Sequence, residues 1–326
     1  MPGLISPVTQ QGPAWYRGDC HVHTIHSDGE LTPEQVTAEA RAAGLNFIAT
    51  TDHNTTAAHG EWDQHAGADL LVILGVEVTT LSGHWLALGV ERGQMVDWQY
   101  GAHNDAIYAC LEGVHDSGGL CVAAHPYAPY ATGTFEYPLQ GIDAVEVWNG
   151  LWQSDRSWNA DNEAAFSDWG HTLADDVTTG SWRPAMGSSD THLAGQLGTP
   201  QTVVMAEDLT ASSILSGLCA GRSWIAESAG VDLSFNAVAG GTTAGIGEYM
   251  QTPGQPVVLQ ASVRGVPAGL ITLHNHQGVL RRAALSPDRP TEVEWRTAAQ
   301  ESAFVRLEVR HPDGQMAALT NPIILS

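Results

Sequence analysis

Residues 17–53, RGDCHVHTIHSDGELTPEQVTAEARAAGLNFIATTDH, contain the pattern that decides the fold. The stretch opens as a short strand, and a helix follows with Thr32 as its N-cap and Gln35 placed to close a capping box. The segment 46–53 is a nearly continuous apolar run, as in strands that are buried on both faces of a parallel sheet. A strand, a helix and a second strand are therefore predicted in succession.

The same alternation continues to about residue 220. Helical patterns at 102–117 and 157–177 separate some of the apolar runs. Five further strands are predicted at 69–80, 84–90, 120–127, 143–150 and 183–192. Such alternation is typical of an α/β barrel or of an open doubly wound sheet, and the pattern alone does not choose between them.

The pattern changes near residue 230. From about residue 231 the chain shows closely spaced short strands with turn signals, and Val305, Leu307 and Val309 alternate with polar residues. Helix signals are lacking there, as is typical of a β-sandwich. We therefore expect two domains, residues 1–230 and residues 231–326, of which the second is a small β-sandwich.

The composition excludes several classes of function. The net charge is −23, and all thirteen basic residues are arginine. Nucleic acid and anionic membrane surfaces are therefore not expected as partners, and chemistry that needs a lysine is excluded. The four cysteines are scattered, and no export signal or long apolar run is visible, so we expect a soluble, cytoplasmic protein. The oligomeric state stays open.

Histidines and carboxylates gather at the ends of the predicted strands. His21 and His23 are two residues apart on a strand, so their rings face the same side, and Asp190 and His192 repeat this spacing. The full set of candidate metal ligands is His21, His23, Asp28, His53, Glu77, His84, His125, Asp190 and His192. Nitrogen and oxygen donors suit Zn, Mn or Fe, and nine donors exceed the need of one ion. Two to three divalent transition-metal ions are therefore expected.

These motifs carry a resemblance to a known family. DCHVHTIHSDG, TTDHN, GVEVTT, SGHWLALG, AAHPY and GSSDTH resemble, in order, the motifs of the PHP family, named for polymerase and histidinol phosphatase. The opening WYRGD and the trailing β-domain are similar to the carbaryl-hydrolase-like branch. The resemblance implies an α/β fold with a distorted (β/α)7 TIM-like barrel and a trinuclear metal centre.

The resemblance also implies an order of ligands. His21, His23, Glu77 and Asp190 would hold a first ion. Glu77 would bridge to a second ion, held also by His84 and His125. A third ion would be held by Asp28, His53 and His192.

The expected activity is that of a metal-dependent hydrolase, because a water that bridges two cations loses a proton near neutral pH and becomes a nucleophile. Hydrolysis of small phosphomonoesters or phosphodiesters is the first hypothesis, with Glu77, Asp190 and His192 as catalytic candidates. Hydrolysis of a carboxylic or carbamic ester is the second, and a catalytically silent, metal-stabilised binding module is the third.

Other residues are expected around the substrate. We expect contacts to a small-molecule ester from Arg17, His26, Asn149 and Arg183. Asp19 and Asp52 are neighbours of ligand histidines, and each either orients an imidazole or caps a loop.

The C-terminal histidines His274 and His276 are expected not to bind metal, because they lie outside the motifs. The double substitution His274→Ala, His276→Ala should keep the wild-type metal content, whereas His21→Ala should lose at least one ion per chain. Elemental analysis of both purified variants checks this. An equal loss in both would contradict the division into a metal-binding part and a C-terminal part.

Overall fold

The computed structural model describes residues 12–252 and 254–326. The stretch in which no export signal was found falls mostly on residues 1–11, outside the described residues.

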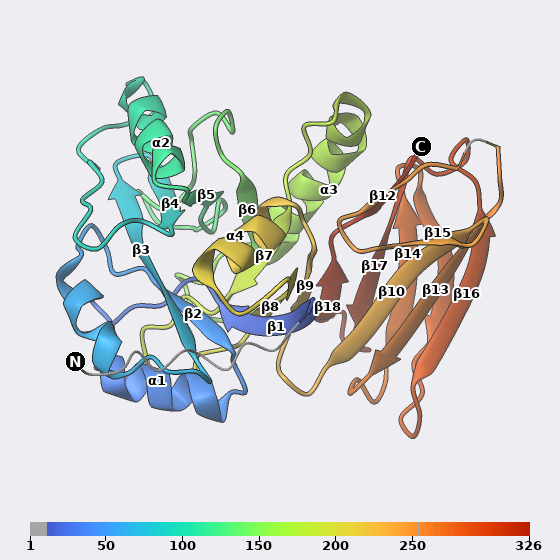
Figure 1. The fold of residues 1–326 in the computed structure, drawn as a ribbon, viewed down its shortest axis with the longest axis horizontal. Helices are drawn as coiled ribbons and strands as arrows, with labels where there is room; N and C mark the ends of the chain where they lie inside the picture. The colour runs from blue at the N-terminus through green and yellow to red at the C-terminus, as the bar shows by residue number, and fades with distance from the viewer. Residues whose placement is uncertain (1–11, 253) are drawn as a thin grey trace.

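Figure 1 shows two lobes, one of mixed helices and strands and one of strands. The first lobe contains β1 (Ala14–Asp19), α1 (Pro33–Ala42), β2 (Phe47–Thr50), β3 (Leu71–Thr80), β4 (Gly83–Leu88), α2 (Ala106–Asp116), β5 (Leu120–Ala123), β6 (Ala144–Asn149), α3 (Asn162–Thr179), β7 (Ala185–Ser188), β8 (Gln201–Ala206), α4 (Ala211–Cys219) and β9 (Ser223–Ala226). Two short 3₁₀ helices, Ala57–Gly60 and Trp62–Gln64, follow β2.

One curled sheet forms the centre of this lobe, in the order β9-β8-β1-β2-β3-β4-β5-β6-β7. β1, β2 and β3 are parallel, as are β5, β6 and β7, whereas β4 is antiparallel to both of its neighbours. The curl brings β7 back to β8, where the Gly187 amide donates to Thr202 Oγ1 at 3.0 Å. The fold is thus mixed α/β. β8 is likewise antiparallel to β1 and β9. With four α-helices and two reversed strands, this lobe departs from a regular alternation of strand and helix, and the sevenfold barrel stays a prediction.

The first strand–helix–strand unit confirms its sequence signals. Gln35 N donates to Thr32 Oγ1 at 3.3 Å and Thr32 N donates to Gln35 Oε1 at 2.9 Å, so the capping box is complete. Every residue of β2 is buried, and the Phe47 ring packs directly on Gly18 of β1, where a Cβ atom has no room. This close packing fixes the strand that leads into His21 and His23.

The C-terminal strands lie in two sheets. They are β10 (Asp232–Ala239), β11 (Thr242–Gly245), β12 (Tyr249–Met250), β13 (Val257–Arg264), β14 (Leu270–Asn275), β15 (Gly278–Ala284), β16 (Thr291–Thr297), β17 (Phe304–Arg310), β18 (Met316–Thr320) and β19 (Ile323–Leu325). One sheet has the order β11-β10-β13-β16. The other C-terminal strands extend the curled sheet, because β18 pairs with β9.

We keep the division at residue 230 as a proposal, since β10 begins at Asp232 and the strand lobe has its own apolar core. The pairing of β18 with β9 crosses this boundary, and Trp224 and Ala226 belong to the C-terminal core. The two proposed units therefore share a hydrogen-bonded sheet and part of a core, and neither is complete without the other. Within the described residues, no helix is both long and apolar enough to cross a membrane.

The side chain of Asn321 ties the units together. Its oxygen accepts from the Ala185 amide at 2.8 Å, and its Nδ2 donates to Ala185 O at 3.1 Å, to Ser223 O at 3.1 Å and to Ser223 Oγ at 2.9 Å. Asn321 is 1% exposed, so its removal leaves buried polar groups without partners.

We expect Asn321→Ala to lower the free energy of unfolding by roughly 2–4 kcal/mol, because several buried backbone groups lose their hydrogen bonds together. Urea unfolding followed by tryptophan fluorescence measures the change. Asn236→Ala is the control, since the Asn236 side-chain oxygen has no hydrogen-bond partner. Equal, small effects of both substitutions would contradict the role of Asn321.

Candidate metal centre

The curled sheet brings together all nine residues that the sequence singled out as ligands. His21 and His23 follow β1, and their strand extension forms a parallel bridge between Val22 and Thr191. His53 follows β2 and forms a bridge to Glu77 on β3. His84 begins β4, and because that strand runs antiparallel to β3, its first residues lie beside the last residues of β3. The reversal of β4 thus explains how a histidine at the start of a strand joins residues at the ends of others.

Glu77 is the centre of the cluster, and it is fully buried. Its Oε2 atom lies 3.2 Å from His21 Nε2, 3.2 Å from His23 Nε2 and 2.9 Å from His53 Nδ1. Its Oε1 atom lies 2.8 Å from His84 Nδ1 and 3.0 Å from His125 Nε2. The two carboxylate oxygens therefore face two different groups of imidazoles.

Two further carboxylates complete the cluster. Asp190 Oδ1 lies 3.3 Å from His21 Nε2 and 3.0 Å from His23 Nε2. Asp28 Oδ1 lies 3.2 Å from His192 Nε2 and 3.5 Å from His53 Nε2. Asp28 is the more exposed of the two, so its end of the cluster opens toward solvent.

The donor atoms fit metal ions better than they fit one another. Four of them are buried without a hydrogen-bond partner: His21 Nε2, His23 Nε2, Glu77 Oε2 and Asp190 Oδ1. The ring nitrogens of His84 and His125 that do not face Glu77, Nε2 and Nδ1, also lack partners. Leaving such atoms unpaired is costly. Ligand atoms bonded to one ion at 2.0–2.1 Å are spaced by about 3.0–3.4 Å, and most contacts in the cluster fall near that spacing.

The cluster divides into four overlapping groups with metal-ligand spacing: His23, Asp28, His53 and His192; His21, His23 and Asp190; His21, Glu77 and His125; and His53, Glu77 and His84. A separate group, His115, Cys121 and Asp143, lies elsewhere in the described chain. Its atoms already have partners, because Asp143 Oδ2 accepts from the Cys121 amide and contacts His115 Nε2, both at 2.8 Å.

Charge shapes the titration of these groups in the metal-free chain. Burial disfavours the protonated form of His53 and would lower its pKa. The negative charges of Glu77 and Asp28 have the larger effect and raise the pKa of His53 to about 10. Burial likewise opposes protonation of His192, yet Asp28 and Asp190 raise its pKa to about 9. The pKa values of Glu77 and Asp190 are held well below their usual range by the surrounding imidazoles, although burial alone would raise them.

A layer of polar groups orients the ligand side chains. Glu146 on β6 lies 3.2 Å from His21 Nδ1 and accepts from the His125 amide at 2.8 Å. The Asn149 amide group donates to Glu146 at 3.1 Å and to Asp190 Oδ2 at 3.3 Å. Asn149, predicted to contact substrate, thus lies within the cluster and braces two of its carboxylates. The Glu146 contact fixes which ring nitrogen of His21 faces the other ligands.

Asp19 and Asp52 accept hydrogen bonds from backbone amides and hydroxyl groups. Of the two roles expected for them, orienting an imidazole or capping a loop, these bonds match the second. Asp19 accepts from the amides of Ser189 and Gly198 at 3.0 and 2.8 Å. Burial raises the pKa of Asp19 to about 6, although these hydrogen bonds oppose the shift. Asp52 accepts from the Thr24 amide at 2.7 Å and from Ser27 Oγ at 2.8 Å. Both carboxylates therefore shape the loops that carry the ligands.

The backbone is strained at two of the proposed ligands. His125 has a φ of 25° and Asp190 a φ of 51°, in the region that non-glycine residues rarely adopt. Asn54, next to His53, has a φ of 51°. Strain of this kind persists only where surrounding contacts enforce it, and it gathers at functional sites.

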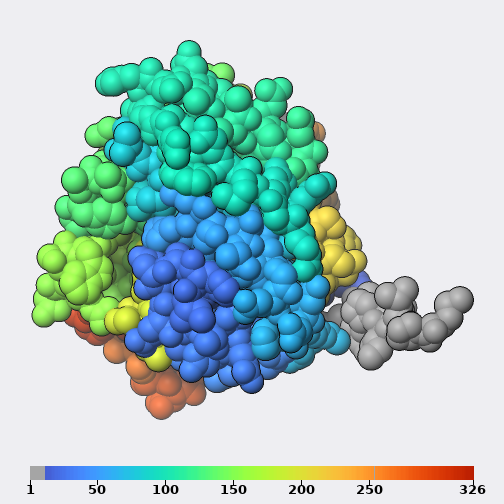
Figure 2. All heavy atoms as spheres, turned by 90° about the vertical axis from the view of Figure 1, so that its left-hand side faces the viewer, coloured from blue at the N-terminus to red at the C-terminus, as the bar shows by residue number. Residues whose placement is uncertain are grey.

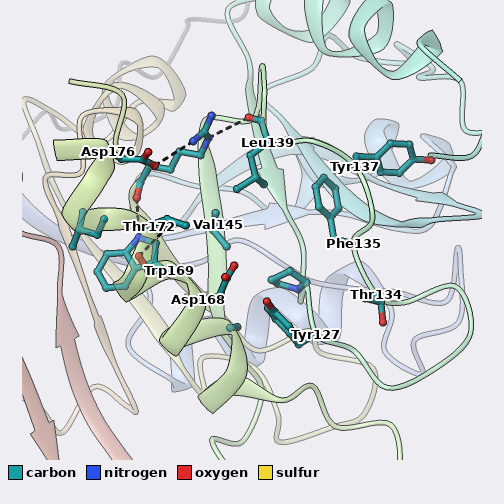
Figure 3. A pocket seen from close by; sticks show the side chains of 14 residues that line it. Tyr127, Thr134, Phe135, Tyr137, Leu139, Val145, Asp168, Trp169, Thr172 and Asp176 are labelled. Atoms are coloured by element: carbon teal, nitrogen blue, oxygen red, sulfur yellow. Dashed lines mark hydrogen bonds and ion pairs between the residues drawn. The ribbon is translucent and has the colours of Figure 1, made fainter. Parts of the chain in front are cut away.

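Three of the residues predicted to bind substrate are not brought to the cluster. Arg17 donates to Val231 O at 2.6 Å and lies over the Trp224 ring. His26 Nε2 lies 3.1 Å from Glu61 Oε1. Arg183 donates to Leu139 O and Ile142 O at 3.1 and 3.0 Å, beside a separate cavity of about 300 Å³ that contains none of the nine residues (Figure 3).

The pocket over the cluster has a volume of about 680 Å³ and is walled by segments far apart in sequence. Residues 149–160 and 189–199 line it together with Asp28 and Tyr130. In Figure 2, the blue N-terminal surface meets the green and yellow segments beside a hollow on this face. Sequence reasoning missed Tyr130, Arg156 and Trp158 as pocket residues. Trp158 falls in the predicted helix 157–177, but α3 begins only at Asn162, and the residues just before it are not helical.

The C-terminal strands support one wall of this pocket. Trp152 Nε1 donates to Glu163 Oε1 at 2.9 Å, and Glu163 also accepts from Arg310 Nη1 on β17 at 2.6 Å. Asn162 donates to the carbonyl groups of Asn149 and Leu151 at 3.1 and 3.0 Å. The segment that begins at Asn149 is therefore anchored to the strand lobe at the start of α3.

Comparison with known proteins agrees with this site. A family model described as the PHP domain matches residues 19–118, which include six of the nine clustered residues. Residues 19–118 are thus similar to the PHP domain, over a little less than a third of this chain.

An uncharacterized protein of Methanocaldococcus jannaschii is 28% identical over 149 residues, which are 41% of this chain and 81% of that protein. A phosphoribosyl 1,2-cyclic phosphate 1,2-diphosphodiesterase of Eggerthella lenta is 39% identical over 84 residues, 23% of this chain and 31% of the enzyme. The 5'-3' exoribonuclease Rnm of Escherichia coli is 42% identical over 66 residues, 19% of this chain and 22% of the enzyme. The chain thus matches a third or less of the length of either named enzyme.

A solved structure from Bacteroides vulgatus, a two-domain protein containing a predicted PHP-like metal-dependent phosphoesterase, resembles the whole chain. The TM-score is 0.53 at 16% identity, and the match covers 96% of each chain. This likeness supports the fold.

Metal uptake by the metal-free protein should release protons near neutral pH. The raised pKa values of His53 and His192 mean that both imidazoles are protonated there, so binding displaces a proton from each. Affinity should fall as the pH falls. Titration of metal into weakly buffered protein with a pH indicator measures the release.

The matched variants are Asp28→Asn and Asp69→Asn. Asp28→Asn should reduce the release, because both histidines lose the carboxylate that raises their pKa values. Asp69→Asn should not, since Asp69 pairs with Arg41 on the exposed surface. Uptake without proton release would contradict the charge distribution described above.

Proposed function

We propose that this chain is a metal-dependent phosphoesterase that hydrolyses small phosphomonoesters or phosphodiesters. The observation that carries the proposal is the buried Glu77 carboxylate, whose two oxygens face two separate groups of imidazoles. A carboxylate with this surrounding is suited to bridge two cations. The match of residues 19–118 to the PHP-domain model supports a hydrolase of this kind.

The proposed ligand assignment follows the two faces of Glu77. His21, His23, Asp190 and Glu77 Oε2 would hold one ion, and His84, His125 and Glu77 Oε1 a second. Asp28, His53 and His192 would hold a third, at the more open end. Zn, Mn and Fe are the ions that suit this nitrogen and oxygen set.

When bound, the ions would supply an acidified water and positive charge for the phosphoryl oxygens. The chain's own groups complete the site. Tyr130 Oη lies 3.5 Å from His125 Nε2, and burial together with the carboxylates raises the pKa of Tyr130, so its phenol stays protonated. Tyr130 is thus positioned to donate a hydrogen bond to an oxygen of the substrate. Asn149 holds Asp190 in place, and Arg156 is the one arginine among the residues that line the pocket.

Further parts of the proposal rest on the resemblance or on composition. We retain the carbaryl-hydrolase-like branch, the distorted (β/α)7 barrel with a C-terminal β-sandwich, and a cytoplasmic location, which four free cysteines favour. A small substrate is preferred over nucleic acid because the net charge of −23 repels a polyanion. The exoribonuclease relative makes RNA the alternative substrate to be tested.

Glu77→Gln should lower turnover by several orders of magnitude, because it keeps the shape but removes the charge that holds two cations together. Asp28→Ala should cost less, since it removes a ligand of the third ion only. The assay is hydrolysis of p-nitrophenyl phosphate and bis-p-nitrophenyl phosphate with Mn or Zn added, together with metal analysis, which should give two to three ions per wild-type chain.

Asp69→Asn serves as the surface control. Comparable turnover by wild type and Glu77→Gln would exclude the bridging role. Cleavage of p-nitrophenyl acetate without cleavage of either phosphoester would favour the carboxylic-ester alternative. Bound metal with no turnover of any ester would favour a binding module.

A further inference from the structure

Large apolar side chains are exposed around the mouth of the metal pocket. Of the twelve such side chains exposed in the described part of the chain, four line this pocket. They are Tyr130, Leu151, Trp158 and Leu193, with exposed fractions of 37%, 50%, 61% and 43%. Grouped exposure of this kind marks a surface that binds an apolar partner or ligand. Beyond the Tyr130 hydroxyl, a phosphoryl group gains nothing from these side chains, so Leu151, Trp158 and Leu193 are available to another part of the substrate.

Trp158 is the most exposed of the four, and its neighbour Arg156 lies against it. The Arg156 guanidinium carbon is 5.9 Å from the centre of the Trp158 ring. No carboxylate of the described residues forms an ion pair with Arg156. The guanidinium supports one face of the indole and leaves the rest of the ring exposed in the pocket wall.

The size of the pocket agrees with a substrate larger than phosphate. Its volume of about 680 Å³ lies within the range of sites for small molecules, and most of its lining residues lie outside the nine clustered residues. Leu151 and Trp158 come from the segment that Glu163 and Arg310 anchor, so the apolar wall is held at a fixed place relative to Asp190.

We infer that the pocket takes small phosphoesters whose alcohol part carries a planar aromatic ring, and that Trp158 selects them by stacking. The inference rests on the proposed function and names its substrate class. Water is added across the bond between phosphorus and the ester oxygen, so the products are the aromatic alcohol and a phosphate, or a phosphomonoester where the substrate is a diester. Aromatic pairs add about tenfold in affinity beyond the area they bury.

The test compares benzyl phosphate with cyclohexylmethyl phosphate, which has a ring of the same carbon number that is not planar. Ethyl phosphate is the substrate without a ring, and each alcohol is also offered as its methyl diester. Both ring-bearing alcohols are alkyl alcohols, so the preference does not arise from a better leaving group. We expect kcat/KM for the benzyl ester to exceed that for the cyclohexylmethyl ester by about tenfold.

Binding gives a readout that does not depend on turnover. Benzylphosphonate and cyclohexylmethylphosphonate cannot be hydrolysed at the P–C bond, and calorimetry with the Mn-loaded protein compares their Kd values. Trp158→Ala should reduce the benzyl preference to about one in both assays, and Trp158→Phe should retain most of it. Trp15→Ala, which removes an exposed tryptophan outside this pocket, should keep the full preference.

Equal kcat/KM and Kd values for the two rings would overturn the inference while leaving the proposed function intact. A preference that survives Trp158→Ala would also overturn it. Faster cleavage of a short RNA than of every small ester, lost in Trp158→Ala, would assign the apolar wall to nucleic acid instead. If no ester is cleaved, the proposed function fails, and the phosphonate Kd values still decide whether Trp158 selects a planar ring.

Discussion

The burial of the Glu77 carboxylate is the constraint on which the rest of this structure depends. A carboxylate with no access to water is stable only beside compensating charge or hydrogen-bond donors. Five imidazoles surround it: two follow β1, and the others lie at or near the ends of β2, β4 and β5. Several of their nitrogen atoms have no hydrogen-bond partner. Bound metal ions would give partners to His21 Nε2, His23 Nε2 and Glu77 Oε2, which have no hydrogen-bond partner within the described structure. The sheet must therefore be curled, because only a curled sheet brings the ends of β1 through β7 around one buried group.

The orienting residues show how the sheet keeps the donors in place. Glu146 and Asn149 on β6 contact His21 and Asp190, whereas Asp19 and Asp52 hold the loops that follow β1, β2 and β7. The positive φ values of His125 and Asp190 belong to the same arrangement, since strained backbone persists where the surrounding contacts enforce it. The positions of the candidate ligands are thus set by hydrogen bonds from neighbouring residues that are not themselves ligand candidates.

The C-terminal strands take part in the site without lying in it. β18 extends the curled sheet through β9, and Asn321 satisfies buried groups on both β7 and β9. Arg310 holds Glu163, which in turn holds Trp152 at the base of the segment that walls the pocket. The strand lobe therefore acts as a brace for α3 and for the wall that begins at Asn149. A lobe with this role shares its core with the first lobe and does not pack on it as a separate body.

The sequence by itself determined the local elements and the ligand candidates. The capping box at Thr32, the buried run 46–53 and the placing of donors at strand ends are local signals, because strand period and helix capping depend on neighbouring residues only. The tertiary structure decided the direction of β4 and the pairing of β18 with β9. It also decided which arginine side chains line the pocket. Arg17 lies on β1 and Arg183 just before β7, so both flank strands that carry ligands, yet their guanidinium groups bind backbone carbonyls elsewhere. Arg156 and Trp158 lie on the segment between β6 and α3, and only the closure of the sheet brings that segment over the cluster. The pairing of β18 with β9 joins residues more than ninety positions apart, such as Ala318 and Ala226, and no local pattern contains a contact of that range.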